Sequence, residues 1–179
     1  MQLTREQLAR PITGVNLRGG TLADQLNGGP ALLVFLRHLG CAFCRELVAD
    51  TRKAVANDPS FPPVIYFFPS PAEAGVDFFE ERHPGAAAVG DADLVFYREL
   101  GLARASLWQM ISPGAFAAVV RAFWKEHRIG GRQGPVTTLP GVLLVDGAGC
   151  VLWRHEAKHA GDHPELAKIA EQLRAFPAA

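Results

Sequence analysis

An apolar segment that leads directly into two closely spaced cysteines is the feature that most constrains how this chain folds. Residues 31–36 are apolar and show no polar alternation, which predicts a strand buried on both faces. Gly40 interrupts this run, and apolar residues at helical spacing follow it. We therefore predict a strand followed at once by a helix, with Cys41 and Cys44 on the first turn of that helix.

The spacing of the two cysteines and their position in the helix predict a redox-active dithiol. Side chains three residues apart share one face of a helix, with Cβ atoms about 5–6 Å apart, which is close enough to relax into a disulfide. The unpaired N–H groups at the helix start favour the thiolate of Cys41. Arg37, His38 and Arg45 flank the pair, and a cation that faces the sulfur strengthens this effect.

Composition indicates an ordinary globular protein. The chain has 179 residues, which suit a single domain spanning 1–179, and 49% of them are hydrophobic. Its 18 basic residues balance 18 acidic ones, so charge gives no reason to expect binding to nucleic acid or to an anionic membrane. No apolar run has the length of a membrane span, and the charged N-terminus lacks the apolar core of a signal peptide. We expect a cytoplasmic protein, in which a CxxC pair is more often catalytic or metal-binding than a structural disulfide.

Strand and helix patterns alternate along the rest of the chain. A capping box at Thr21 and Asp24 starts a short helix, and Asn27 begins the turn that ends it. The cysteine helix is expected to end near Asn57. Further strands are predicted at 64–68, 86–89, 142–145 and 150–153, and further helices at 71–82, 94–100 and 165–176. This order predicts an α/β protein with a mainly parallel sheet that is covered on both faces.

Residues 102–130 interrupt the alternation with apolar residues at helical spacing, including Trp108 and Trp124. The stripe predicts a helical insert of one helix, or of two helices separated at residues 112–114. Such stripes usually pack against a core. The alternatives are a lid over the dithiol or a contact in a homodimer.

Two motifs give the chain a resemblance to thioredoxin-like proteins. They are Cys41-Ala-Phe-Cys44 after Val-Phe-Leu-Arg-His-Leu-Gly, and Thr138-Leu-Pro140-Gly-Val-Leu-Leu-Val-Asp146. The second resembles the segment that places a cis-proline against the active-site disulfide, which implies a cis peptide bond before Pro140. The first is similar to the peroxiredoxin-like branch of the alkyl hydroperoxide reductase and thiol-specific antioxidant group, which includes the prostamide/prostaglandin F synthase type. The resemblance implies an α/β, thioredoxin-like fold with a central mixed sheet flanked by helices and a helical insert at about 102–130.

The resemblance also implies a thiol-dependent oxidoreductase that acts through Cys41 and Cys44. Arg37 and His38, which lie beside the pair, would support the active site, and the resemblance adds Pro140, without a bound cofactor or metal. His38 is either a proton carrier for the dithiol or a structural histidine. The implied substrate is a disulfide, a hydroperoxide or an endoperoxide, and the implied electron donor is a thioredoxin- or glutaredoxin-like dithiol protein.

Peroxiredoxins carry a Pro-xxx-Thr/Ser-xx-Cys pattern and a late arginine. Aligned on Cys44, this chain has Cys41 in the hydroxyl position and Arg37 in the proline position, and Pro140 stands where the arginine is expected. Thioredoxin-type dithiol exchange therefore fits this sequence better than the usual peroxidase arrangement.

Two questions stay open at this point: which of the two cysteines attacks first, and whether the protein is an enzyme. We expect the better-exposed Cys41 to attack and Cys44 to resolve, whereas the peroxiredoxin alignment makes Cys44 the peroxidatic thiol. The contrasting class is a non-catalytic binding or scaffold protein on the same fold. In that case the cysteines and histidines 155, 159 and 163, which are spaced by four, provide candidate zinc ligands.

Overall fold

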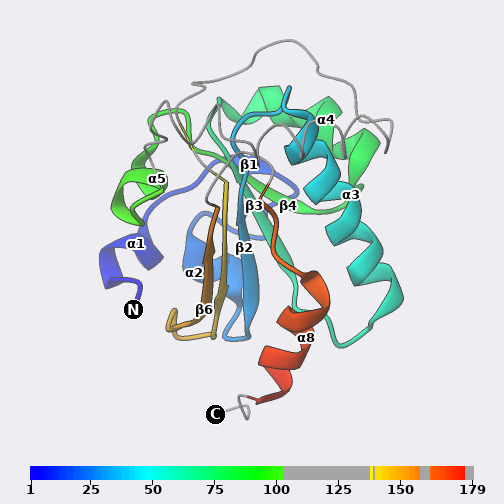
Figure 1. The fold of residues 1–179 in the computed structure, drawn as a ribbon. Coiled ribbons are helices and arrows are strands. Elements are labelled where there is room, and N and C mark those ends of the chain that lie inside the picture. Colours follow the sequence, from blue (N-terminus) through cyan, green and yellow to red (C-terminus); the bar gives the residue numbers. More distant parts are fainter. Residues whose placement is uncertain (103–137, 139, 158–161, 176–179) are drawn as a thin grey trace.

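A computed structural model describes residues 1–102, 138, 140–157 and 162–175 of the chain (Figure 1). Within these residues a six-stranded sheet has the order β1-β4-β3-β2-β5-β6. The strands are β1 (Gly14–Val15), β2 (Ala31–Phe35), β3 (Val64–Phe68), β4 (Ala87–Gly90), β5 (Gly141–Val145) and β6 (Val151–Glu156). No helix in the described ranges is both long enough and apolar enough to cross a membrane.

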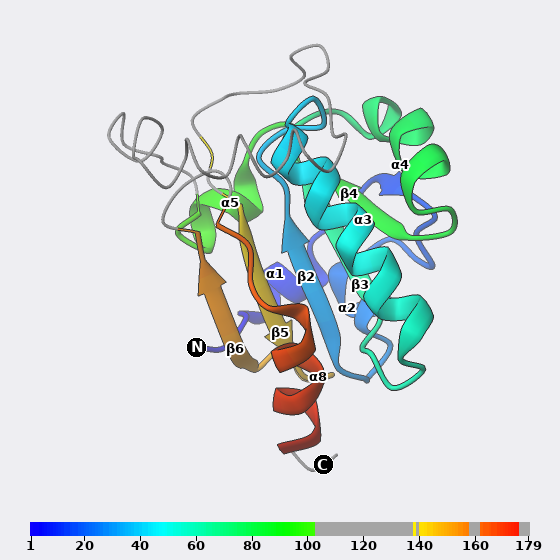
Figure 2. The same cartoon turned by 45° about the vertical axis from the view of Figure 1, so that its right-hand side comes forward.

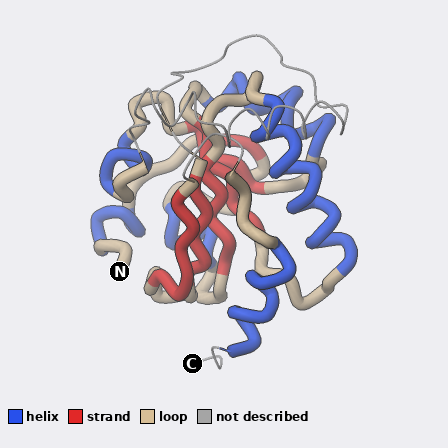
Figure 3. Tube along the Cα trace, in the orientation of Figure 1, coloured by secondary structure: helices blue, strands red, loops and turns tan. Residues whose placement is uncertain are grey.

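Helices cover both faces of this sheet. They are α1 (Arg5–Ala9), α2 (Leu22–Leu26), α3 (Ala42–Asn57), the 3-10 turn η1 (Ala72–Gly75), α4 (Val76–Arg82), α5 (Val95–Glu99) and α8 (Leu166–Ala175). Helices α3 and α8 lie in front of the sheet in Figure 2, and α1, α2 and α5 lie behind it. Figure 3 shows the strands as a layer between these two sets of helices. The predicted α/β fold, with a central mixed sheet flanked by helices, is confirmed.

Strand β2 is the centre of the sheet and of the core. Its residues alternate between two clusters, because successive side chains of a strand point to opposite faces. Leu32 and Val34 join the cluster beneath α3 and α8, while Leu33 and Phe35 join the cluster beneath α1, α2 and α5. All of them are fully buried, which confirms the predicted strand buried on both faces.

The pairing of β2 decides what lies near the cysteines. Its parallel neighbour is β3, and its antiparallel neighbour is β5. The carboxyl ends of β2 and β3 and the amino end of β5 therefore meet at one edge of the sheet. Helix α3 begins at this edge, as predicted, and ends at Asn57.

Most of the other predicted elements are confirmed within one or two residues, and three features differ. The sheet is not mainly parallel: two pairings are parallel and three are antiparallel, since β1, β5 and β6 all add in the antiparallel sense. The helix predicted at 71–82 begins as the 3-10 turn η1 and becomes α-helical at Val76. Strand β1 was not predicted because two residues are too few to show a period. The insert predicted at 102–130 lies outside the described residues, apart from the buried Leu102.

Replacing Thr21 with alanine should lower the free energy of unfolding by about 1 kcal/mol, which is typical of a lost helix cap. The Thr21 hydroxyl accepts the N–H of Asp24 at 3.2 Å, and the Asp24 carboxylate accepts the N–H of Thr21 at 2.9 Å. Urea denaturation of the variant measures the change. Thr21→Ser keeps the hydroxyl and should stay close to the parent, so an equal loss in both variants would contradict this role of the cap.

Candidate active site

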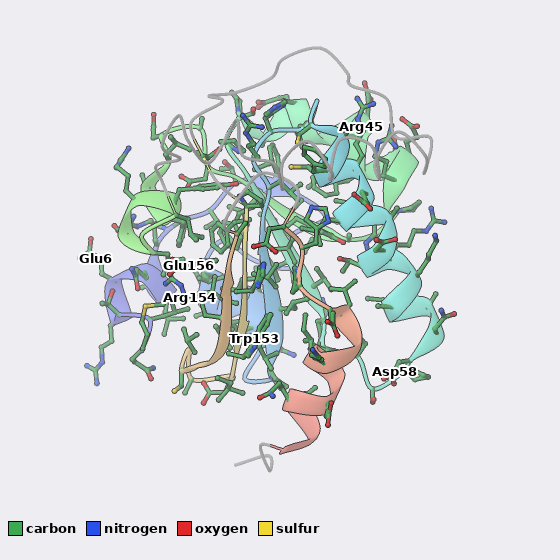
Figure 4. The ribbon with its side chains drawn as sticks, viewed as in Figure 1. Glu6, Arg45, Asp58, Trp153, Arg154 and Glu156 are labelled. Carbon is green, nitrogen blue, oxygen red and sulfur yellow. The ribbon has the colours of Figure 1, made fainter. Side chains whose placement is uncertain are left out.

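Cys41 and Cys44 lie where the chain passes from β2 into α3. Cys41 is the N-cap of α3, and Cys44 lies in its first turn. The N–H of Cys41 donates to the carbonyl of His38 at 3.1 Å, and the N–H of Arg45 donates to the carbonyl of Cys41 at 3.1 Å. Figure 4 marks this end of α3 by Arg45 and the opposite end by Asp58.

Both cysteines are reduced and nearly buried. Neither sulfur is in a disulfide. Cys41 is 5% exposed and Cys44 is 1% exposed, so Cys41 is the more accessible of the two, as expected, although it is far from an open surface thiol. A substrate therefore meets only a small exposed area of Cys41 in this structure.

The two thiols have opposite acidities. The pKa of Cys41 is lowered to about 6, first because the Cys44 thiol donates a hydrogen bond to its sulfur, and then because the N–H of Cys44, the charge of Arg37 and the N–H of Phe43 favour the thiolate against desolvation. Burial, followed by the neighbouring Cys41, raises the pKa of Cys44 well above its ordinary value. Near neutral pH the pair is thus a Cys41 thiolate that accepts a hydrogen bond from a neutral Cys44 thiol.

Backbone donors hold the Cys44 sulfur from the side of the sheet. The N–H of Arg37 donates to this sulfur at 3.2 Å. The next N–H, that of His38, also donates to it. The Cys44 sulfur consequently accepts from the end of β2 and donates to Cys41.

The residues predicted to support the site all lie at this edge of the sheet. Arg37 is half-buried, and its positive charge favours the Cys41 thiolate. His38 is buried, and its role as a proton carrier stays a prediction. Pro140 is buried and directly precedes β5, next to the end of β2, because Gly141 pairs with Phe35. The predicted cis peptide bond before Pro140 includes residue 139, which lies outside the described residues.

Two buried side-chain hydroxyls at the same edge of the sheet are not among the site residues predicted from the sequence. The Tyr97 hydroxyl lies 2.5 Å from the carbonyl oxygen of Leu36, and the Thr138 hydroxyl donates to the carbonyl of Arg37 at 2.8 Å. Thr138 belongs to a motif that the sequence analysis identified, although its side chain had no assigned role. No sequence signal points to Tyr97, since its partner is 61 residues away along the chain.

The candidate zinc histidines make other contacts. His155 Nε2 is 3.6 Å from Asp162 Oδ1, and His163 Nδ1 is 4.0 Å from Glu46 Oε2. His159 lies outside the described residues. Among the residues that the structure describes, no group of three or more histidine, cysteine, aspartate or glutamate side chains is arranged to hold a metal ion.

The third cysteine lies far from the pair. Cys150 follows the turn after β5, whose last residue, Val145, pairs with Ala31 at the start of β2. Cys41 and Cys44 follow the opposite end of β2. A strand of five residues spans about 17 Å, so Cys150 does not form a disulfide with either of them in this fold.

Comparison with known proteins gives a family and a fold. A family model described as AhpC/TSA antioxidant enzyme matches residues 35–159, which include both cysteines. No curated protein matches the chain significantly.

Solved structures with this fold include both peroxidases and disulfide oxidoreductases. Peroxiredoxin Q of Xanthomonas campestris is 15% identical and has a TM-score of 0.67, with 98% of this chain and 96% of that chain covered. Peroxidoxin BcpB of Mycobacterium tuberculosis is 16% identical with a TM-score of 0.58, covering 95% of this chain and 97% of that chain. A secreted disulfide oxidoreductase of Mycobacterium tuberculosis is 16% identical with a TM-score of 0.57, covering 97% of this chain and 100% of that chain. At these identities the likeness establishes the fold and leaves the chemistry to the site itself.

The rate of Cys41 alkylation by iodoacetamide should rise with pH and level off above a midpoint at about pH 6. Only the thiolate reacts, and the rate for an ordinary thiol has its midpoint at about pH 8.5. Mass spectrometry of the digested protein, in a Cys150→Ser background, identifies which cysteine has reacted.

Cys44→Ala is the matched variant for this titration. It removes the thiol that donates to the Cys41 sulfur, so the midpoint should move to higher pH. A variant that keeps the parent midpoint would show that the hydrogen bond from Cys44 is not the main cause of the lowered pKa.

Proposed function

The chain belongs to the AhpC/TSA antioxidant enzyme family and is a thiol-dependent oxidoreductase, and we propose that it reduces a peroxide with Cys41 as the nucleophile and Cys44 as the resolving thiol. One observation carries this assignment: the Cys41 thiolate accepts a hydrogen bond from the neutral Cys44 thiol. The thiolate is the nucleophilic form of cysteine, and the second thiol is already in contact with it.

In the proposed reaction two electrons pass from the thiol pair to the peroxide. The Cys41 thiolate attacks one peroxide oxygen, so that an S–O bond forms while the O–O bond breaks. Cys41 becomes a sulfenic acid, and the other oxygen takes a proton and leaves as an alcohol or water. Cys44 then loses its proton and attacks the Cys41 sulfur, which forms the disulfide and releases water. The sum is one peroxide and two thiols converted to one alcohol, one water and one disulfide.

In this proposal Arg37 partly replaces the hydroxyl and the late arginine of the peroxiredoxin pattern. The hydroxyl position of the peroxiredoxin pattern is occupied by Cys41, and the late arginine position by Pro140. The guanidinium of Arg37 lies close enough to stabilise the Cys41 thiolate. We propose that the same charge also stabilises the peroxide oxygen that leaves during attack, because this oxygen develops negative charge close to the Cys41 sulfur.

A second candidate substrate is a disulfide. The presence of Cys41 where the peroxiredoxin pattern has Thr or Ser favours it. A Cys41–Cys44 pair at the start of a helix can reduce a disulfide by attack of Cys41, release of one thiol, and attack of Cys44 on the mixed disulfide. One solved structure with this fold is a disulfide oxidoreductase. The burial of Cys41 argues for the peroxide first, since a small molecule needs less opening of the site than a protein disulfide does.

The proposed electron donor is a dithiol protein of the thioredoxin or glutaredoxin type. Each catalytic cycle leaves a Cys41–Cys44 disulfide, which an external dithiol reduces by the same exchange chemistry. A cytoplasmic location is part of this proposal, because such donors keep thiols reduced there. The homodimer suggested by the insert stays a prediction.

Single cysteine variants should assign the order of attack. Cys44→Ser should accumulate a sulfenic acid or a mixed disulfide on Cys41 after exposure to a peroxide or a disulfide, because the resolving thiol is absent. Cys41→Ser should accumulate neither. Dimedone labelling and non-reducing gels, both in the Cys150→Ser background, detect the two products. The reverse pattern would make Cys44 the attacking thiol.

Substrate competition should distinguish the two candidate substrates. With a thioredoxin system as donor, we expect turnover with an alkyl hydroperoxide to exceed turnover with a small disulfide, measured as consumption of NADPH. Arg37→Gln should lower the peroxide rate more than Arg37→Lys does, since lysine keeps the charge. Turnover with the disulfide alone would favour the dithiol-exchange alternative.

A further inference from the structure

We propose that Tyr97 is a positioning residue for the dithiol and acts through the peptide group between Leu36 and Arg37. This inference rests on the proposed function, in which Cys41 attacks and Cys44 resolves. In this role the buried Tyr97 hydroxyl orients and polarises the Arg37 N–H, which donates to the Cys44 sulfur. Neither the family pattern nor the cysteine spacing points to this residue.

The contacts run through one peptide group. Tyr97 lies on α5 and is fully buried. Its hydroxyl oxygen is 2.5 Å from the carbonyl oxygen of Leu36 and 2.9 Å from that of Phe67. The carbonyl of Leu36 and the N–H of Arg37 are the two ends of the same planar peptide unit. That N–H donates to the Cys44 sulfur at 3.2 Å.

The hydrogen bonds that link Tyr97 to Cys41 form a series in which every donor points toward Cys41. The Tyr97 O–H donates to the Leu36 carbonyl, the Arg37 N–H donates to Cys44, and the Cys44 thiol donates to Cys41. Each bond in such a series polarises the next, which strengthens a chain by about 10–30% per bond. The negative charge on Cys41 lies at the accepting end. Tyr97 therefore stabilises the Cys41 thiolate without touching it.

Thr138 repeats the arrangement one residue further along. Its hydroxyl donates to the carbonyl of Arg37 at 2.8 Å, and the N–H of the same peptide unit belongs to His38. That N–H is the second backbone donor to Cys44. Two successive peptide groups are thus each held by a buried hydroxyl on one side while their N–H groups face one sulfur on the other.

The fold holds Tyr97 firmly enough for this role. The carboxylate of Asp91 accepts the N–H groups of Val95 at 2.8 Å, Phe96 at 2.9 Å and Tyr97 at 3.3 Å, which fixes the first turn of α5. The Tyr97 ring meets the ring of Phe35 edge to face, with centroids 5.2 Å apart. Burial, then the nearby Cys44 and Asp91, raise the pKa of Tyr97 well above its ordinary value. Tyr97 consequently remains a donor throughout the range in which Cys41 titrates.

Tyr97→Phe tests the proposal, and Tyr66→Phe is its matched control. These are the only two tyrosines of the chain, and both are fully buried with a hydrogen-bonded hydroxyl. The Tyr66 hydroxyl bonds to His83 Nδ1 at 2.9 Å, outside the series that ends at Cys41. The readout is the pH profile of Cys41 alkylation, which needs no substrate.

Tyr97→Phe should slow alkylation of Cys41 by roughly two- to fourfold at about pH 6, and much less where the thiol is fully ionised in both proteins. Tyr66→Phe should leave the profile unchanged. Equal profiles for the parent and Tyr97→Phe would overturn the proposal. An equal displacement in both tyrosine variants would also overturn it, since it would indicate general loosening.

Thr138 supplies an independent second test. Thr138→Val should displace the profile in the same direction as Tyr97→Phe, and Thr138→Ser should restore it because serine keeps the hydroxyl. Thr51→Val is the control, since the buried Thr51 hydroxyl donates to Leu47 within α3 at 2.7 Å. An unchanged Thr138→Val profile would remove the second hydroxyl from the proposal.

The parent profile separates this inference from the proposed function. A parent protein whose Cys41 titrates like an ordinary thiol would contradict the activated nucleophile itself. A parent with a midpoint at about pH 6, combined with an unaltered Tyr97→Phe variant, would leave the proposed function standing and refute only the positioning role.

Discussion

The central strand β2 is the constraint on which the rest of the structure depends. It pairs on both edges and is buried on both faces, so its position is set from four sides. The chain that leaves it must satisfy its backbone donors in a buried place, because an unpaired N–H there is costly. The Arg37 N–H donates to the Cys44 sulfur. The end of the strand and the start of α3 are therefore joined through the reactive pair.

Burial makes each hydrogen bond at this junction more effective. A sulfur in solvent exchanges its partners with water, whereas Cys44 is 1% exposed and keeps the partners that the fold provides. The same burial penalises charge, so both thiols cannot ionise together. The hydrogen bond from the Cys44 thiol, the helix N–H groups and the charge of Arg37 all favour the thiolate of Cys41, and burial keeps Cys44 neutral. The division between nucleophile and resolving thiol thus follows from the surroundings of each sulfur.

The elements that the sequence predicts correctly are those whose signals lie close together in the chain. The strand at 31–36, the helix that carries the cysteines and the capping box at Thr21 are all encoded by neighbouring residues and were predicted close to their observed bounds. The prediction of a mainly parallel sheet was wrong because the edge strand β1 is too short to show a period, and because local patterns do not reveal that β5 pairs with β2 in the antiparallel sense. Arg37 was predicted because it flanks the cysteine pair, and Pro140 because of the family resemblance; their roles in the reaction remain proposals.

The sequence by itself determined that two sulfurs stand at a strand-to-helix junction, because periodicity and a spacing of three are local properties of the chain. Only the tertiary structure decided which groups surround them. Tyr97 reaches Leu36 across 61 residues, and Thr138 reaches Arg37 across 101 residues. A hydrogen bond requires its two atoms to meet within a few tenths of an ångström and at a suitable angle. Strand register and helix packing set such positions, and no local pattern in the chain records them.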